Sequence, residues 1–374
     1  MHVKSTWILL LILFSGTSFP CWGHFPDSTK ASTSITFVFA GDIMGHSTQI
    51  KAAFDEKSGQ YRYDSVFKYL KPVLSGVDFA IANLEVTLAG EPYTGYPRFS
   101  SPDALALACK NAGFNCMATA NNHCCDRGDT GLVRTLNVLD MLDIRHTGTF
   151  RDEQDQAANN PLILKKHGIK VALLNYTYGT NGLKVSSPIR VNRIDKNQIL
   201  KDVSLAKQVH ADQIILFFHW GKEYQTLPGK SQKDLVNFCD SLGVNIVIGS
   251  HPHVIQPLEW YPQKSGYGTE LIAWSLGNLI SNQRNEKTDG GAMIRFTIKK
   301  DSTGTHISNA GYALNWVYRP YLKGKFHYFI LPVREFENRP EFFKRKDDFG
   351  KMKWFIQNTR TLFEEKNRGI GEFY

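Results

Sequence analysis

The sequence predicts an α/β fold built mainly on a parallel sheet. Short apolar runs rich in β-branched and aromatic residues recur along the 374-residue chain, and most are followed by a loop and a stretch with helical spacing. Clusters of His, Asp, Asn or Glu come directly after several of these runs, at the strand ends where α/β folds place their chemistry. No composition shift marks a linker, so we expect one catalytic unit over residues 35–335 and a C-terminal appendage over residues 336–374.

The strands and helices of the expected parallel sheet come first along the chain. Ile35 to Ala40 (ITFVFA) is a β-branched and aromatic run, so it predicts a first central strand that ends at Gly41-Asp42. Further buried strands are expected at residues 79–82, 114–118, 171–175, 214–218 and 244–248. Helices are expected at residues 65–75, 102–112, 129–142, 196–210 and 229–242.

After Glu270 the pattern changes to strands that are joined by turns. These strands are expected at residues 271–275, 292–298, 307–318 and 326–333. They are predicted to be antiparallel and to complete a second sheet. The tail over residues 340–366 has basic and aromatic residues at helical spacing, so it predicts an amphipathic helix packed on the surface.

Residues 1–23 have the pattern of a secretory signal peptide. Lys4 supplies a positive charge, Trp7 to Phe14 form an apolar core, and small and polar residues follow up to Gly23. The apolar run is too short to span a bilayer comfortably. We therefore expect cleavage and export to the periplasm or cell envelope, with a retained N-terminal membrane anchor as the alternative.

The charge and the cysteines limit the partners and the covalent structure. A formal net charge of +9 favours an anionic partner, such as a polyanionic polymer, a phosphorylated lipid or a membrane surface. The chain has no aromatic–basic motif that would stack on bases, so no nucleic acid is expected as a partner. Without Cys21 an odd number of cysteines remains, which predicts free buried thiols, with a Cys109–Cys116 pair as the alternative.

The segment Gly249 to Gln256 is the most informative part of the sequence. Pro252 fixes the backbone between His251 and His253, and histidine is the commonest metal ligand. Similar clusters follow four other predicted strands, namely GDIMGH at 41–46, NLE at 83–85, ANNHCCDRG at 120–128 and HWGKEY at 219–224. Any of these residues can also be a plain turn or strand-end residue. Together they predict a site for one or two divalent transition-metal ions, Zn²⁺, Mn²⁺ or Fe²⁺.

These motifs, with SLGN at 275–278, resemble those of the CapA-type poly-γ-glutamate capsule-synthesis family, which is related to the calcineurin-like metallophosphoesterases. They occur in the family's order over residues 36–283. The resemblance implies a four-layered α/β sandwich of calcineurin-like metallophosphoesterase type around a metal site. That architecture agrees with the strand pattern above.

The resemblance also implies which residues bind the metal. Asp42 would hold one ion, and His46 is a further candidate at a longer spacing than the superfamily's Asp-x-His. Glu85 would be the carboxylate that bridges two ions. The remaining implied ligands are Asn122, His219, His251 and His253.

Catalytic roles follow from the same resemblance. His123 would act on the leaving group, and Asp126 would orient its ring. The implied function is an exported, metal-dependent hydrolase or transferase that acts on an anionic polymer or a phosphorylated envelope substrate, with membrane synthase or export partners. The alternatives are an envelope metallophosphoesterase and a non-catalytic subunit of a polymer synthase.

Overall fold

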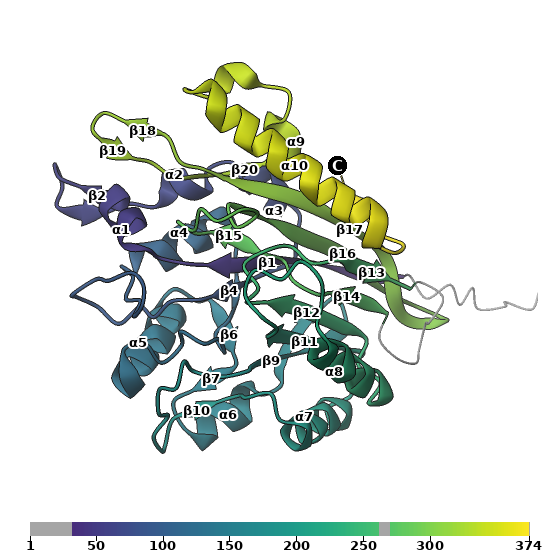
Figure 1. Cartoon of the computed structure of the whole chain (residues 1–374). Coiled ribbons are helices and arrows are strands. Elements are labelled where there is room, and N and C mark those ends of the chain that lie inside the picture. Colours follow the sequence, from purple (N-terminus) through teal and green to yellow (C-terminus); the bar gives the residue numbers. More distant parts are fainter. Residues whose placement is uncertain (1–31, 262–269, 374) are drawn as a thin grey trace, which may run out of the picture. The chain divides into compact units, whose positions relative to one another are not determined.

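The computed structural model describes residues 32–261 and 270–373, so the signal peptide expected over residues 1–23 lies outside the described residues. The larger sheet has the strand order β20-β17-β16-β1-β4-β5-β6, and β15 and β21 pair with β1 and β17 (Figure 1). Its strands are β1 (Thr33–Ile43), β4 (Phe79–Leu84), β5 (Cys116–Ala118), β6 (Arg145–Thr147), β15 (Asn278–Ile280), β16 (Gly290–Asp301), β17 (Gly304–Tyr318), β20 (Phe329–Pro332) and β21 (Gly371–Glu372).

A second sheet has the strand order β13-β14-β12-β11-β9-β8. Its strands are β8 (Leu162–Lys166), β9 (Ile169–Thr177), β11 (Gln213–His219), β12 (Ile246–Ser250), β13 (Leu258–Trp260) and β14 (Leu271–Ala273). Three short pairs lie outside the two sheets, namely β2 (Phe54–Asp55) with β3 (Gln60–Tyr61), β7 (Thr149–Phe150) with β10 (Arg190–Val191), and β18 (Tyr321–Leu322) with β19 (Lys325–Phe326).

The helices of the described residues lie on the outer faces of the sheets and at their edges (Figure 1). They are α1 (Ser47–Ala53), α2 (Asp64–Phe67), α3 (Lys71–Leu74), α4 (Ala104–Ala112), α5 (Gly128–Met141), α6 (Glu153–Asn159), α7 (Lys196–Gln208), α8 (Lys230–Ser241), α9 (Val333–Phe336), the 3₁₀ turn η1 (Pro340–Phe342) and α10 (Lys346–Lys366). Among them, none is both long and apolar enough to cross a membrane.

Alternation along β1 shows how the layers form. Phe37 and Phe39 point to the interface between the two sheets, where the Phe39 ring meets the edge of Phe217 on β11 at 5.7 Å. Val38 and Ala40 point the other way, into a core shared with α2, α3 and α4. On the far side of the second sheet, α7 and α8 cover a third core. Because successive side chains of a strand face opposite ways, each sheet buries both faces. The predicted four-layered α/β sandwich is confirmed.

The prediction that the strands after Glu270 complete a second sheet is wrong for most of them. β14 does join the second sheet, where it runs parallel to β12. β16 instead pairs antiparallel with β1 in the first sheet, and β17 and β20 follow it there. An alternating apolar pattern predicts a half-buried strand, but it does not say which open sheet edge the strand will pair with.

Several element boundaries also differ from the sequence prediction. The helix expected over residues 65–75 is divided into α2 and α3, because Pro72 has no N–H and favours a new helix start. The strand expected over residues 326–333 is shortened to β20. Phe326 belongs instead to the preceding strand, β19. The tail helix starts at Lys346 as α10, where Phe363 packs edge-on against Tyr312 of β17 at 4.6 Å.

The cysteines of the described residues are all free and buried, as expected. Burial raises the pKa of Cys109 and Cys116, which suits their place as small apolar side chains in the core.

Candidate metal centre

The candidate site lies where the carboxyl ends of strands from both sheets meet. Asp42 is the tenth residue of β1, and Glu85 follows the last residue of β4. His219 is the last residue of β11, and His251 follows the last residue of β12. All four side chains are buried. Parallel strands therefore place residues from four separate parts of the sequence at one edge, as the sequence analysis expected.

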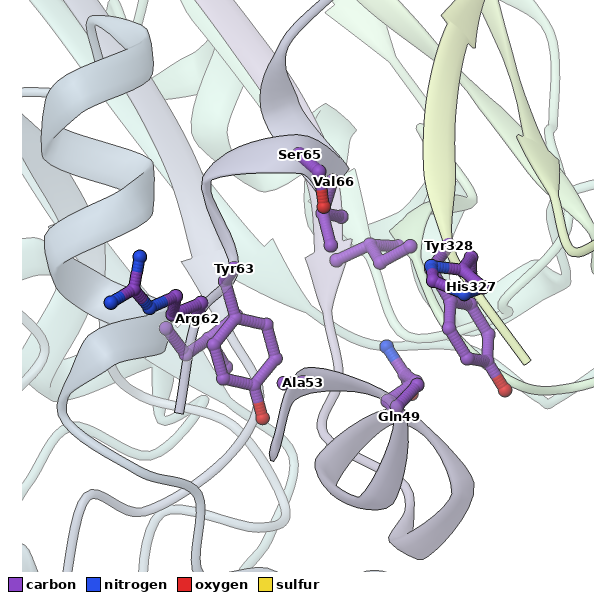
Figure 2. A pocket seen from close by; sticks show the side chains of 11 residues that line it. Gln49, Ala53, Arg62, Tyr63, Ser65, Val66, His327 and Tyr328 are labelled. Atoms are coloured by element: carbon purple, nitrogen blue, oxygen red, sulfur yellow. The ribbon is translucent and has the colours of Figure 1, made fainter. Parts of the chain in front are cut away.

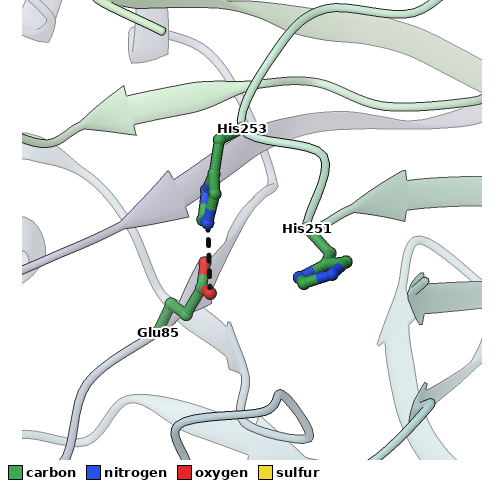
Figure 3. Close-up of side chains that lie close together, drawn as sticks. All are labelled: Glu85, His251 and His253. Atoms are coloured by element: carbon green, nitrogen blue, oxygen red, sulfur yellow. Dashed lines mark ion pairs between the residues drawn. The ribbon is translucent and has the colours of Figure 1, made fainter. Parts of the chain in front are cut away.

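Two overlapping groups of these side chains can each hold a metal ion. One group contains Glu85, His251 and His253, and the other contains Asp42, Glu85 and His219, with the ligand atoms of each group within 4.8 Å of one another. Figure 3 shows the Glu85 carboxylate directed at the His253 ring, with His253 Nε2 3.9 Å from Glu85 Oε1. Glu85 belongs to both groups, and its role as a carboxylate that bridges two ions stays a prediction.

Burial is the main influence on the protonation of the two groups. Burial, and then the neighbouring Asp42 carboxylate, raise the pKa of Glu85 well above its ordinary value. Burial lowers the pKa of His251 to about 3 and holds that of His219 well below its ordinary value, so both imidazoles are neutral. Neutral imidazoles and adjacent carboxylates are the protonation states in which these side chains bind metals.

Unpaired buried atoms provide a direct test of whether these residues fit a metal ion. Glu85 Oε1 and His251 Nδ1 are buried and accept or donate no hydrogen bond among the described residues. A buried polar atom without a partner costs free energy, so such atoms in a folded protein need an explanation. A mixed carboxylate and imidazole donor set suits Zn²⁺, Mn²⁺ or Fe²⁺. The residues therefore fit a divalent transition-metal ion.

Backbone conformation around the His-Pro-His segment is unusual. His251 has φ 96° and His253 has φ 57°, although neither is a glycine. Non-glycine residues in this region are uncommon and strained, and they concentrate at functional sites. The His251 N–H is directed at Asp42 Oδ2 at 3.4 Å, and His253 Nδ1 lies 3.1 Å from the same oxygen. The strained segment thus brings the His251 backbone N–H and the His253 imidazole to the Asp42 carboxylate.

Asn122 also reaches this centre, as expected. Its Oδ1 lies 2.9 Å from His219 Nε2, and both side chains are buried. The preceding Asn121 donates through Nδ2 to the Leu84 carbonyl at 2.8 Å, which fastens this loop to the end of β4.

His123 and Asp126 form a buried pair on the same loop. His123 Nδ1 lies 2.8 Å from Asp126 Oδ2, which also accepts from the Phe99 N–H at 2.7 Å. The Phe99 ring packs edge-on against His123 with centroids 4.7 Å apart. One ring nitrogen of His123 is therefore occupied and the ring plane is held, which leaves Nε2 for other partners.

His46 is not part of either metal-competent group. It is the N-cap of α1, and its Nδ1 lies 3.1 Å from Gln49 Oε1 and accepts from the Asn282 N–H at 3.2 Å. Burial lowers its pKa to about 4. Its longer spacing from Asp42 places its ring beside the centre, against Phe99 at 5.3 Å, and its role as a ligand stays a prediction.

Two asparagines at the centre were quoted in motifs but given no role by the sequence analysis. Asn83 donates through Nδ2 to Asp42 Oδ1 at 2.8 Å and lies 3.2 Å from His219 Nδ1. Asn278 Oδ1 lies 3.2 Å from His253 Nδ1. Both orient metal-competent side chains. Their position at a strand end, one or two residues from a predicted ligand or in the SLGN motif, was the available signal.

Exposed aromatic rings border the centre. Tyr178 is 47% exposed, stacks on His219 with ring centroids 6.2 Å apart, and lies 4.6 Å from His251. Tyr224 is 43% exposed and lies 6.4 Å from the His253 ring. These rings are available for contact with a ligand at the centre.

A small cavity of about 20 Å³ lies apart from the candidate centre (Figure 2). Figure 2 shows Arg62 and Tyr63 on one side of it, His327 and Tyr328 on the other, and Gln49 between them. None of the metal-competent side chains lines it, so it is a separate feature of the core.

Comparison with known proteins places these features in a family. The model of the family described as "Bacterial capsule synthesis protein PGA_cap" matches residues 36–283. The capsule biosynthesis protein CapA of Bacillus anthracis is 27% identical over 289 residues, which cover 74% of this chain and 67% of that protein. The PGA biosynthesis protein CapA of Bacillus subtilis (strain 168) is 27% identical over 317 residues, which cover 80% and 78%.

The chain is also similar to solved structures at low sequence identity. The NAD nucleotidase of Haemophilus influenzae gives a TM-score of 0.49 at 13% identity, over 92% of this chain and 65% of that one. The calcineurin-like phosphoesterase YfkN from Bacillus subtilis gives a TM-score of 0.45 at 12% identity, over 88% of this chain and 98% of that one.

Proposed function

The chain belongs to the bacterial capsule synthesis protein (PGA_cap) family, and we propose that it is an exported, metal-dependent hydrolase or transferase acting on an anionic polymer of the cell envelope. The observation that supports this most is the buried group of Asp42, Glu85, His219, His251 and His253. A polymer of the poly-γ-glutamate type is the substrate class that the relatives' names suggest, and the basic net charge of the chain suits it.

Metal binding is proposed for one or two Zn²⁺, Mn²⁺ or Fe²⁺ ions. Glu85 is common to the two groups and would be a ligand in either of them, and Asn122 would join His219. When bound, the metal activates a water or hydroxyl nucleophile and stabilises negative charge on the attacked phosphorus or carbonyl centre. Asn83 and Asn278 hold the Asp42 and His253 side chains in place.

Proton transfer is proposed for His123. Asp126 holds the Nδ1 side of its ring, so Nε2 is the atom that can donate a proton to the departing oxygen or nitrogen. Tyr178 and Tyr224 would contact the substrate from the open side of the centre. Export, with or without a retained anchor, and contact with a membrane synthase are part of the same proposal.

Elemental analysis of protein purified without chelator tests the metal. We expect bound Zn, Mn or Fe, and a loss of most of it in the His251→Ala, His253→Ala double variant. The matched control is His167→Ala, His210→Ala, which removes two exposed histidines that also have positive φ. Equal metal content in the two double variants would contradict the proposed ligands.

Turnover separates the proposed reaction from its rivals. Shortening of poly-γ-glutamate, or transfer of its end to an amine, by the metal-loaded protein supports the proposal. Hydrolysis of a simple phosphoester with an unchanged polymer would instead indicate a phosphoesterase. Bound metal without turnover of either substrate would indicate a non-catalytic subunit.

A further inference from the structure

A polar hollow of about 220 Å³ lies at the amino-terminal end of α10. Its walls come from the loop after β15, the end of β17, the β18–β19 hairpin and the first two turns of α10. Four cationic side chains and two acidic ones line it, namely Arg284, Arg319, Arg345 and Lys351 against Asp289 and Asp348. The hollow therefore has two positive charges in excess.

The cations are poorly neutralised by the protein itself. Across the part of the chain that the structure describes, Arg284, Arg319 and Lys351 form no ion pair with a carboxylate within 4.0 Å. One oxygen of the Asp289 carboxylate, Oδ2, accepts from the Trp316 indole N–H at 2.9 Å. Most guanidinium and ammonium donors in the hollow are thus available to an outside anion.

Arg319 is held in a fixed orientation. Its guanidinium lies over the Phe326 ring, 4.5 Å from the centroid, and its Nη1 donates to Asn282 Oδ1 at 2.8 Å. Tyr328 donates to the same oxygen through its hydroxyl at 2.6 Å. A guanidinium that is already oriented loses little conformational freedom when an oxyanion binds to it.

The start of α10 adds to the positive potential. Arg345 is the N-cap of this 21-residue helix, and no side chain caps its first N–H groups. Asp348 and Lys351 follow at helical spacing and face the same hollow. The free N–H groups of a helix start favour an anion.

The same loop joins the hollow to the candidate metal centre. The Asn282 N–H donates to His46 Nδ1 at 3.2 Å, and Arg284 lies only two residues further on. Gln283 accepts at Oε1 from Asn278 Nδ2 at 2.9 Å, and Asn278 in turn contacts His253. One side of this loop therefore touches the centre while Arg284 lines the hollow.

We propose that this hollow is a binding site for an oxyanion, and that its occupant is a carboxylate of the anionic polymer adjoining the unit at the metal centre. The proposal of a polymer carboxylate rests on the proposed function, whereas the oxyanion site itself rests only on the cations and the helix start. Inorganic phosphate is a second source of the same chemistry, so the test includes it.

Equilibrium binding of fluorescent poly-γ-glutamate oligomers tests the site at constant low ionic strength. The Arg284→Gln, Lys351→Gln variant should weaken binding by roughly tenfold, because two charge-assisted contacts are lost. The control, Lys201→Gln, Lys233→Gln, removes two exposed cations from α7 and α8 and should weaken binding less than about twofold. Metal content and melting temperature should be unchanged in both.

Equal affinities of the wild type and the two variants, both for the oligomers and for inorganic phosphate, would overturn the site. Competition with inorganic phosphate identifies the source of the anion. If the hollow variant loses phosphate binding while polymer binding stays at the wild-type level, the oxyanion site stands and the polymer carboxylate is refuted. If polymer binding depends on the hollow but no turnover occurs, the proposed reaction is refuted and this inference stands.

Discussion

Individual buried side chains determine the chemistry of the candidate centre. Glu85 and His251 each have a buried atom without a hydrogen-bond partner, and they lie in the same metal-competent group. Burying such atoms is unfavourable unless something compensates for their lost hydration. A bound cation would provide that compensation, so we expect the folding free energy and the metal affinity of this protein to be coupled.

At the same scale, His123→Asn should lower turnover by roughly a hundredfold to ten-thousandfold, the typical contribution of a positioned acid. The metal content and the melting temperature should stay near the wild-type values, because His123 belongs to neither metal-competent group. Single-turnover kinetics and elemental analysis of the same sample measure both quantities.

Asp126→Asn is the partner variant for this test. It keeps the side-chain shape and the oxygen that accepts from Phe99, but it removes the negative charge beside His123. We expect a smaller loss of turnover and a shifted pH–rate profile. A parallel fall of metal content and activity in His123→Asn would show that this histidine is a ligand.

The pKa of His46 leads to a pH-dependent stability. Its pKa is about 4 in the folded protein and 6.5 when unfolded, chiefly because of burial. Between these values the unfolded chain binds the extra proton, so stability is present above pH 6.5 and is lost as the pH falls toward 4. His46→Gln should remove on the order of 1 kcal/mol per pH unit of this slope.

Urea unfolding of the metal-free protein at several pH values in this window measures the slope. His306→Gln, a half-buried histidine on β17, is the control and should leave the slope as in the wild type. Identical slopes in the wild type and in His46→Gln would contradict the assignment.

At the scale of elements, the C-terminal helix α10 is fastened by one arginine. Arg360 donates through Nη1 to Glu337 Oε2 at 2.6 Å, just after α9, and through Nε to Glu372 Oε2 of β21 at 3.0 Å. The Arg360 hydrogen bond is the main reason why the pKa of Glu337 is lowered. The helix α10, the end of α9 and the last strand β21 are thus joined through a single side chain.

Arg360→Met should lower the free energy of unfolding by about 1 kcal/mol, a modest value because the group is a third exposed. The loss should shrink as the pH falls below the ordinary pKa of Glu337 and through its lowered pKa in the folded protein, because the paired carboxylate is protonated only below that lower value. Denaturant titration measures it. Lys366→Met, whose ammonium lies 3.8 Å from Glu365 in an exposed pair, should change stability by less than about half as much.

At the scale of the whole described fold, the interface between the sheets supports the centre. Asp42 and Glu85 come from one sheet, and His219 and His251 come from the other. Contacts across the interface, such as Phe39 with Phe217, therefore set the spacing between the two halves of the ligand set. Small changes in the packing between the sheets should therefore change the affinity of the centre for a metal ion.

Phe217→Ala should lower the free energy of unfolding by about 3–5 kcal/mol and also weaken metal binding. Phe218→Ala is the matched control, because it removes an equally buried phenylalanine of β11 that faces α7 and α8 instead. Its loss of stability should be similar, with metal affinity closer to wild type. Calorimetric metal titration below the melting temperature measures the affinity of both variants. Equal losses of metal affinity in Phe217→Ala and Phe218→Ala would refute the coupling between sheet packing and the metal centre.

Much of this architecture follows from local sequence patterns. The runs at Ile35, Ile214 and Val244 predict buried strands, because strand burial on two faces demands continuous apolar sequence. Polar residues placed directly after such runs must lie at a sheet edge. Asp42, Glu85 and His219 were therefore identifiable without a structure. Asn83 and Asn278 were not assigned, because an orienting hydrogen bond leaves no spacing pattern of its own.

The sequence by itself determined the α/β class. It also determined which predicted strand each candidate ligand follows and what type of residue each ligand is. Hydrophobic periodicity and composition are local properties, so they can be read from short segments. Tertiary structure alone decided that β16 pairs with β1 and that Glu85 is common to two ligand groups. It also decided that Arg284 and Lys351 share one hollow. Those facts depend on which sheet edges meet and on packing between residues far apart in the chain, and no local pattern encodes that choice.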